Sequence, residues 1–138
     1  MPDHPPYPVE LITPEGVAFQ GEAEMLVVPG AAGELGILSN HAPLISLLKP
    51  GETRITDEQG AVRRYATDDG YLQVRQNRAV VLVGEAVDAE SVDAGEASRR
   101  LDEARAALER AEGGDGDIYA ARREAAFAEA LTKVAGSR

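Results

Sequence analysis

The sequence predicts an α+β protein, with an N-terminal antiparallel β-sandwich followed by a C-terminal antiparallel α-helical hairpin. Up to residue 88, turn-forming residues separate short apolar runs at intervals of about 8–12 residues, which is typical of a sandwich or barrel. The composition then changes, because residues 89–138 contain 14 alanines in 50 positions and no proline. We therefore expect two domains, a β-sandwich over residues 1–88 and a helical hairpin over residues 89–138.

Eight runs are predicted as strands, since several of them alternate apolar and polar residues as half-buried strands do. Residues 1–8 precede them as a proline-rich arm that we expect to be extended or frayed. The run 17–28 is long for one strand, so Gly21 is expected to bend it or to start a second strand. The predicted strands cover residues 9–13, 17–28, 34–38, 44–49, 53–57, 61–67, 70–75 and 79–87.

The stretch 30–44, GAAGELGILSNHAPL, is predicted as a corner presented between two strands. Its glycines indicate backbone turns or close approach by a neighbour, and Pro43 indicates a strand start or an edge. Corners held by a rigid scaffold often carry binding contacts. Glu34 is either a solvated loop residue or a charge offered to a basic partner. His41 is either a hydrogen-bonded turn residue or a contact with a partner.

Two helices are predicted after residue 88. Asp93 and Glu96 have the spacing of a capping box at the start of the first helix. The glycine-rich segment 112–117 ends that helix, and Asp115 or Asp117 caps the second, which is expected to run to about residue 135. The short connection makes the helices antiparallel neighbours. Residues expected to form the apolar stripes are Ala97, Leu101, Ala104, Leu108 and Ala111 on the first helix and Phe127, Leu131 and Val134 on the second.

Composition excludes several classes of function. The chain has 138 residues, no cysteine and two histidines, which rules out disulfides and thiolate chemistry and makes a multi-histidine metal site implausible. A net charge of −10 argues against nucleic acid and anionic lipid as partners. No apolar run is long enough to cross a membrane. No constellation of catalytic residues is recognisable, so we expect a noncatalytic protein without a required cofactor, soluble in a reducing compartment.

The segment 101–106, LDEARA, lies on the predicted first helix. In ordinary helix chemistry, Leu101 and Ala104 belong to the seam, while Asp102 and Arg105 form an ion pair three residues apart. The alternative is functional, since Asp102 can accept a hydrogen bond from a ribose or amino group and Arg105 can bind phosphate. The spacing alone does not decide between these two interpretations.

Three segments in this order resemble one known family: GELGILSNHAPL at 33–44, LKPG at 48–51 and LDEARA at 101–106. The sequence is similar to the epsilon subunit of the bacterial F-type ATP synthase, although Ser39-Asn40 replaces the usual Pro-Gly. The resemblance implies a noncatalytic rotor subunit of the central stalk, which couples rotation of the c-ring to ATP synthesis. It also implies a peripheral location at the cytoplasmic face of the plasma membrane, without membrane insertion. The residues implied to contact the gamma subunit and the c-ring are Gly33, Glu34, Leu35, Gly36 and His41.

The resemblance also makes the hairpin a regulatory element. In the family it can extend into the catalytic alpha/beta head and block ATP hydrolysis, or fold back onto the sandwich. Some members stabilise the folded form with ATP through Ile/Leu-Asp-x-x-Arg-Ala. The match to this motif supports an expectation of regulatory ATP. Glu112 argues against it, because ATP-binding members have a basic residue at this position. The implied ATP-binding residues are Glu96, Leu101, Asp102, Arg105, Ala106, Arg122 and Arg123.

One alternative from another class stays open, a stand-alone β-sandwich binding module with a helical oligomerisation hairpin.

The hairpin has few large apolar side chains for its length, so docking onto another surface must supply part of its stability. We therefore expect an element that can be docked or released.

Overall fold

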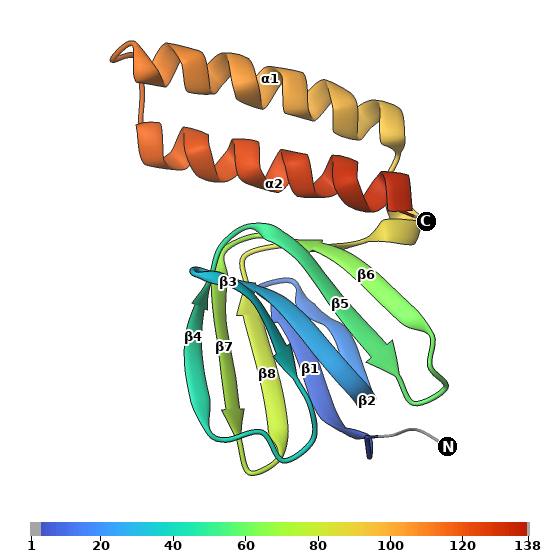
Figure 1. Cartoon of the computed structure of the whole chain (residues 1–138). Coiled ribbons are helices and arrows are strands. Elements are labelled where there is room, and N and C mark those ends of the chain that lie inside the picture. The colour runs from blue at the N-terminus through green and yellow to red at the C-terminus, as the bar shows by residue number, and fades with distance from the viewer. Residues whose placement is uncertain (1–3, 138) are drawn as a thin grey trace.

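The computed structural model describes residues 4–137 and consists of a two-layer β-sandwich with a helical hairpin at one end (Figure 1). The predicted fold class is confirmed. The strands are β1 Tyr7–Thr13, β2 Gly16–Gly30, β3 Gly33–Ile37, β4 Leu44–Leu48, β5 Gly51–Asp57, β6 Val62–Thr67, β7 Gly70–Arg75, β8 Arg78–Val83 and β9 Ala86–Asp88. The helices are the 3-10 turn η1 Ala89–Ser91, α1 Ala94–Glu112 and α2 Ile118–Ser137.

The strands form one continuous sheet that folds into two layers. One layer has the order β1-β8-β7-β4, with β1 parallel to β8, and the other contains β2-β5-β6-β9 with β3 on the free side of β2. The long β2 joins the layers, since its first half pairs with β1 and its second half with β5 and β3. Buried residues of both layers form the sandwich core, among them Val9, Leu26, Ile55, Leu72 and Val81.

Three details of the predicted strands are wrong. Residues 1–3 of the predicted arm lie outside the described part, but Tyr7 belongs to β1 and is buried, with its hydroxyl donating to the Ile37 carbonyl at 2.6 Å. Gly21 stays in register opposite Val9. One irregularity of β2 lies between Val17 and Phe19, in its pairing with β1, and the other, between Ala23 and Met25, lies in its pairing with β5. The long-range pairing of β2 with two different strands, which no local signal reports, sets these positions.

The predicted last strand, 79–87, is also two strands. β8 ends at Val83 and pairs in one layer with β7, whereas β9 begins at Ala86 and pairs in the other layer with β6. The chain changes layer at Gly84-Glu85, where the Asp68 backbone N–H donates to the Glu85 carbonyl at 2.9 Å. A continuous valine-rich run conceals this crossover in the sequence.

The helical hairpin matches the prediction closely. Asp93 caps α1 by accepting a hydrogen bond from the Glu96 backbone N–H at 3.0 Å, and Asp117 caps α2 through the Tyr119 and Ala120 N–H groups. The Glu96 carboxylate pairs with Arg99, so the reciprocal half of the predicted capping box is replaced by an ion pair. The seam between the helices buries the predicted residues Leu101, Ala104, Ala125 and Ala128. The predicted Ala97 and Ala111 are buried as well, Ala97 in the cluster that packs against the sandwich.

Helix α2 attaches the hairpin to the sandwich. Phe127, Leu131 and Val134 pack with Ala66 of β6 and with Val92 in a second apolar cluster, separate from the sandwich core. The hairpin therefore lies in its folded-back position, with α2 packed against β5 and β6 at one end of the sandwich (Figure 1). The expected docking surface is thus provided by the sandwich itself.

Candidate functional site: two docking surfaces on the sandwich and the hairpin joint

The stretch 30–44 does not form a single corner. Strand β3 begins beside β2 with Gly33 opposite Gly30 and ends with Ile37 opposite Leu26. Its four residue steps, at about 3.3 Å each, place roughly 13 Å between its two ends. Glu34 lies at the end of the sandwich where Gly30 pairs with Leu48 of β4. Glu34 and His41, both expected to contact partners, therefore lie toward opposite ends of β3.

The turn at the Glu34 end depends on its glycines. A Cβ on Gly30 would lie 2.6 Å from the Gly33 carbonyl oxygen, and Gly33 has φ +138°, a value that side-chain-bearing residues rarely adopt. These glycines let β2 and β3 approach closely and fix the start of β3. The predicted backbone role of both residues is confirmed, and its effect is to place Glu34 against the neighbouring strands.

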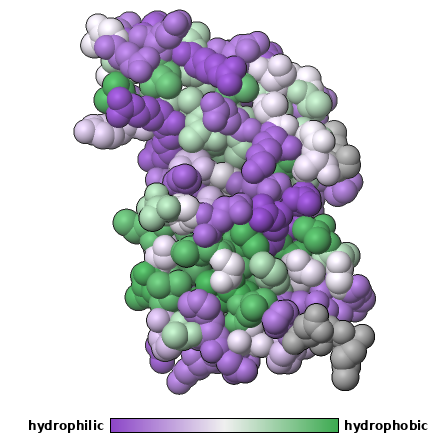
Figure 2. Space-filling view, in the orientation of Figure 1, coloured by the Kyte–Doolittle hydropathy of each residue, from purple (hydrophilic) through white to green (hydrophobic). Residues whose placement is uncertain are grey.

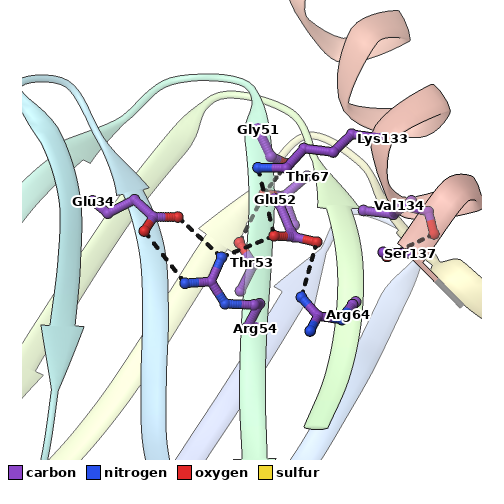
Figure 3. Close-up of polar contacts among 10 residues, drawn as sticks. All are labelled: Glu34, Gly51, Glu52, Thr53, Arg54, Arg64, Thr67, Lys133, Val134 and Ser137. Carbon is purple, nitrogen blue, oxygen red and sulfur yellow. Dashed lines mark hydrogen bonds and ion pairs between the residues drawn. The ribbon is translucent and has the colours of Figure 1, made fainter.

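Glu34 is held by Arg54 of β5. The guanidinium donates from Nη1 to Glu34 Oε2 at 3.0 Å and from Nη2 to Oε1 at 3.3 Å, while Nη1 also reaches Glu52 Oε1 at 2.8 Å (Figure 3). The Arg54 guanidinium lowers the pKa of the Glu34 carboxyl below its ordinary value. The Glu34 side chain is still 55% exposed, so it is both bound internally and open to a partner.

Glu52 lies at the centre of this network. Its side chain is 3% exposed, because it lies where α2 packs against the ends of β5 and β6. Its second oxygen accepts from Arg64 Nη1 at 3.4 Å, and Lys133 Nζ of α2 lies 3.7 Å from its first (Figure 3). Arg54 and Arg64 are directly opposite on β5 and β6, a like-charged pair that the carboxylate between them compensates. Nothing in the local sequence indicates this buried glutamate.

His41 lies at the other end of the sandwich, in the connection between β3 and β4. Its Nδ1 is 2.7 Å from the carbonyl oxygen of Ala42. Asn40, which precedes it, has φ +61° and donates its backbone N–H to Asn77 Oδ1 at 2.6 Å. Asparagine is one of the few residues that adopt this left-handed conformation readily, as glycine does. The Ser39-Asn40 replacement is therefore compatible with a turn that glycine would otherwise form.

An exposed apolar face covers the outer side of the layer β4-β7-β8-β1. Leu47, Tyr71, Leu82 and Ile12 lie opposite one another in successive strands, and Ile45 lies beside this row on β4. Ile45 is 73%, Leu47 71% and Tyr71 44% exposed. Hydrophobic residues gather over this part of the sandwich in Figure 2. The sequence carries a signal that was missed: LISLL at 44–48 has apolar residues at both inward and outward positions of its strand.

The residues of α1 that are implied to bind ATP lie on different sides of the helix. Leu101 is buried in the seam between α1 and α2, and Glu96 is paired with Arg99. Asp102, Arg105 and Ala106 are exposed together on another side of α1. Only these three of the five α1 positions therefore share an open surface.

The basic residues of α2 also diverge. Arg123 turns toward the sandwich, where Nη1 lies 3.9 Å from Asp69 Oδ2. Arg122 is exposed and lies seven residues before Glu129, on the same side of the helix. Arg105 of α1 is already paired with Glu129 across the hairpin at 3.6 Å. Glu112 lies on the Asp102 side of α1, at the edge of the same shallow depression.

Within residues 4–137, no group of three or more histidine, cysteine or acidic side chains is arranged to hold a metal ion. The same part of the chain contains no helix long and apolar enough to cross a membrane.

Residues 7–89 match the family model described as ATP synthase, Delta/Epsilon chain, beta-sandwich domain. This match spans more than half of the chain, so the protein belongs to the delta/epsilon chain family of ATP synthase.

Similar proteins within that family are epsilon chains. The ATP synthase epsilon chain of Persephonella marina is 42% identical over 106 residues, covering 77% of this chain and 78% of the relative. The epsilon chain of Desulforamulus reducens is 36% identical over 132 residues, covering 91% and 92%. The resemblance seen in the sequence is confirmed.

Solved structures show the same fold. A chain of the Euglena gracilis mitochondrial ATP synthase, in a structure of OSCP, F1 and c-ring, superposes with a TM-score of 0.80 at 20% identity, covering 99% of this chain and 84% of its own length. A chain from the central stalk and c-ring of the Tetrahymena thermophila enzyme has a TM-score of 0.60 at 17% identity, covering 91% and 93%. Both matches include the hairpin as well as the sandwich.

Proposed function

We propose that this protein is a noncatalytic rotor subunit of a proton-translocating ATP synthase, docked in the central stalk between the gamma subunit and the c-ring. The apolar face of β4, β7, β8 and β1 is the observation that carries this proposal. Contiguous exposed apolar surface on a small acidic protein marks an interface with another chain. Ile45 and Leu47 stand next to one another on this face and are largely exposed, so a partner that covers it would bury them.

We assign this apolar face to the gamma subunit and the exposed carboxylate of Glu34 to a basic loop of the c-ring. The two surfaces are different parts of the sandwich, so one subunit can contact two partners at once. His41, at the end of β3 remote from Glu34, then belongs with the apolar face. In this arrangement the protein associates peripherally with the cytoplasmic side of the membrane through the complex.

We further propose that the hairpin regulates hydrolysis in the alpha/beta head. In the folded-back position α2 uses its large apolar residues against the sandwich, so they are unavailable to the head. Regulatory ATP would bind at the exposed surface of α1 that carries Asp102 and Arg105. There it would compete with Glu129, whose carboxylate already forms an ion pair with the Arg105 guanidinium. Because Glu112 also faces this side, we expect any ATP binding to be weak.

Binding to the purified gamma subunit tests the principal proposal. Leu47→Asp places a charge among the most exposed residues of the apolar face, and we expect the affinity of the full chain for gamma to fall by about tenfold or more. Val62→Asp is the matched control, since Val62 is 48% exposed on β6 of the other layer. Equal binding by wild type and Leu47→Asp would contradict the assignment of this face.

A further inference from the structure

The network around Glu52 connects the surface that carries Glu34 to the docking of the hairpin. Lys133 on α2 and Arg54 on β5 both contact the same atom, Oε1 of Glu52, at 3.7 and 2.8 Å. The same Nη1 of Arg54 also donates to Glu34. Glu34 therefore competes with Glu52 for Arg54, and Arg54 competes with Lys133 for Glu52 (Figure 3).

The charges of the network make this competition directional. Three cations, Arg54, Arg64 and Lys133, surround two carboxylates, Glu34 and Glu52. Neutralising Glu34 leaves the three cations with one carboxylate, so Arg54 turns fully to Glu52 and the ammonium of Lys133 is repelled. Lys133 adds the contact of α2 with Glu52 to the apolar docking of the helix, so its displacement weakens the docking of the hairpin.

The burial of Glu52 strengthens the link. A carboxylate that is 3% exposed is stable only while cations compensate it, and α2 is the element that keeps it from water. When the hairpin leaves, Glu52 regains hydration and no longer depends on Lys133. Release of the hairpin therefore does not leave the Glu52 carboxylate buried without a compensating charge. The equilibrium between the docked and the released hairpin then depends on the charge at Glu34.

We propose that Glu34, Arg54, Glu52 and Lys133 form a charge relay through which a cationic side chain of a partner, bound at Glu34, loosens the docked hairpin. The proposal rests on the proposed function only in taking Glu34 as a partner contact. Since binding free energies are reciprocal, docking of the hairpin also weakens the binding of that cation at Glu34. Exposed charges couple modestly, so the expected effect is about two- to fivefold.

Hydrogen exchange of the isolated full chain tests the relay, with Glu34→Gln standing in for a Glu34 neutralised by a partner. We expect the α2 amides of residues 127–134 to exchange about two- to fivefold faster in Glu34→Gln and in Lys133→Gln. The core amides of β7 and β8 serve as an internal reference and should stay unchanged. Glu22→Gln on β2 and Arg122→Gln on α2 are matched controls, because both residues are exposed and lie outside the network.

The decisive variant is the double mutant. If the relay exists, Glu34→Gln adds no further acceleration once Lys133 is replaced, and the effect of Glu34→Gln shrinks in high salt. Independent, additive accelerations would overturn the proposal, as would an unchanged α2 in Glu34→Gln. Binding to gamma is a separate measurement on the apolar face, so a failure of the relay is distinguishable from a failure of the proposed function.

Discussion

The guanidinium of Arg100 on α1 lies over the ring of Phe127 on α2, with Cζ 5.0 Å from the ring centroid. The same guanidinium donates to Glu124 Oε1 from Nε at 2.7 Å and lies 3.8 Å from Glu85 of the sandwich. One side chain thus joins both helices and the sandwich at the point where α2 enters its apolar cluster. This joint adds an ion pair and a cation–π contact to the apolar docking of α2.

Replacement of Arg100 by alanine should destabilise the hairpin by about 1 kcal/mol, the sum of a partly exposed ion pair and a cation–π contact. Denaturant unfolding followed by the helical circular dichroism signal measures the change. Arg99→Ala is the control and should cost less, since among residues 4–137 the ion-pair partners of Arg99 are the exposed Glu96 and Glu103 of its own helix. An equal loss in both variants would show that Arg100 has no special role at the joint.

Phe127→Ala should release the hairpin while the sandwich stays folded. Phe127 is 1% exposed, and truncation of a buried phenylalanine costs about 3–5 kcal/mol, which is large for a hairpin with few large side chains. We expect rapid proteolysis of the helices and intact protection of residues in β7 and β8. Tyr119→Ala, at a position that is 79% exposed, should leave proteolysis unchanged. Simultaneous loss of both parts would mean that they fold as one unit.

Stability should fall at alkaline pH through Tyr7. Burial raises the pKa of the Tyr7 hydroxyl, which is protonated and donates to the Ile37 carbonyl in the folded state. The unfolded chain ionises at the ordinary tyrosine pKa of about 10, so this contribution is complete below that pH and is lost as the pH rises above it. Tyr7→Phe should cost about 1 kcal/mol at pH 8 and should flatten the alkaline decline. Urea titrations between pH 8 and 11 measure both effects, and an unchanged slope would contradict the assignment to Tyr7.

ATP binding to the hairpin should be weak and should depend on the competition at Arg105. Calorimetry with ATP is expected to give a dissociation constant in the millimolar range for the wild type and no heat for Arg105→Ala. Glu129→Gln removes the carboxylate that now holds the guanidinium at 3.6 Å, so it should tighten binding about two- to fivefold. Absence of heat in both the wild type and Glu129→Gln would dispose of regulatory ATP.

Much of the fold could be predicted because its signals are local. The caps Asp93 and Asp117, the buried seam of α1 and the stripe of Phe127, Leu131 and Val134 follow from helical periodicity and capping chemistry. The alternation that predicts β7 is confirmed by the burial of its apolar positions. The crossover between β8 and β9 escaped prediction because one apolar run serves two layers.

The candidate sites, like the fold, combine features that follow from local sequence with features that depend on tertiary contacts. By itself, the sequence determined the family, the two kinds of structure and the glycine turn that starts β3, since short-range backbone chemistry and motif order carry them. Only the tertiary structure decided that Glu34 and His41 are at opposite ends of the sandwich and that Arg54 and Lys133 contact one buried carboxylate, Glu52. Strand pairing and helix docking bring those residues together, and a charge in the sequence does not say which neighbours will compensate it.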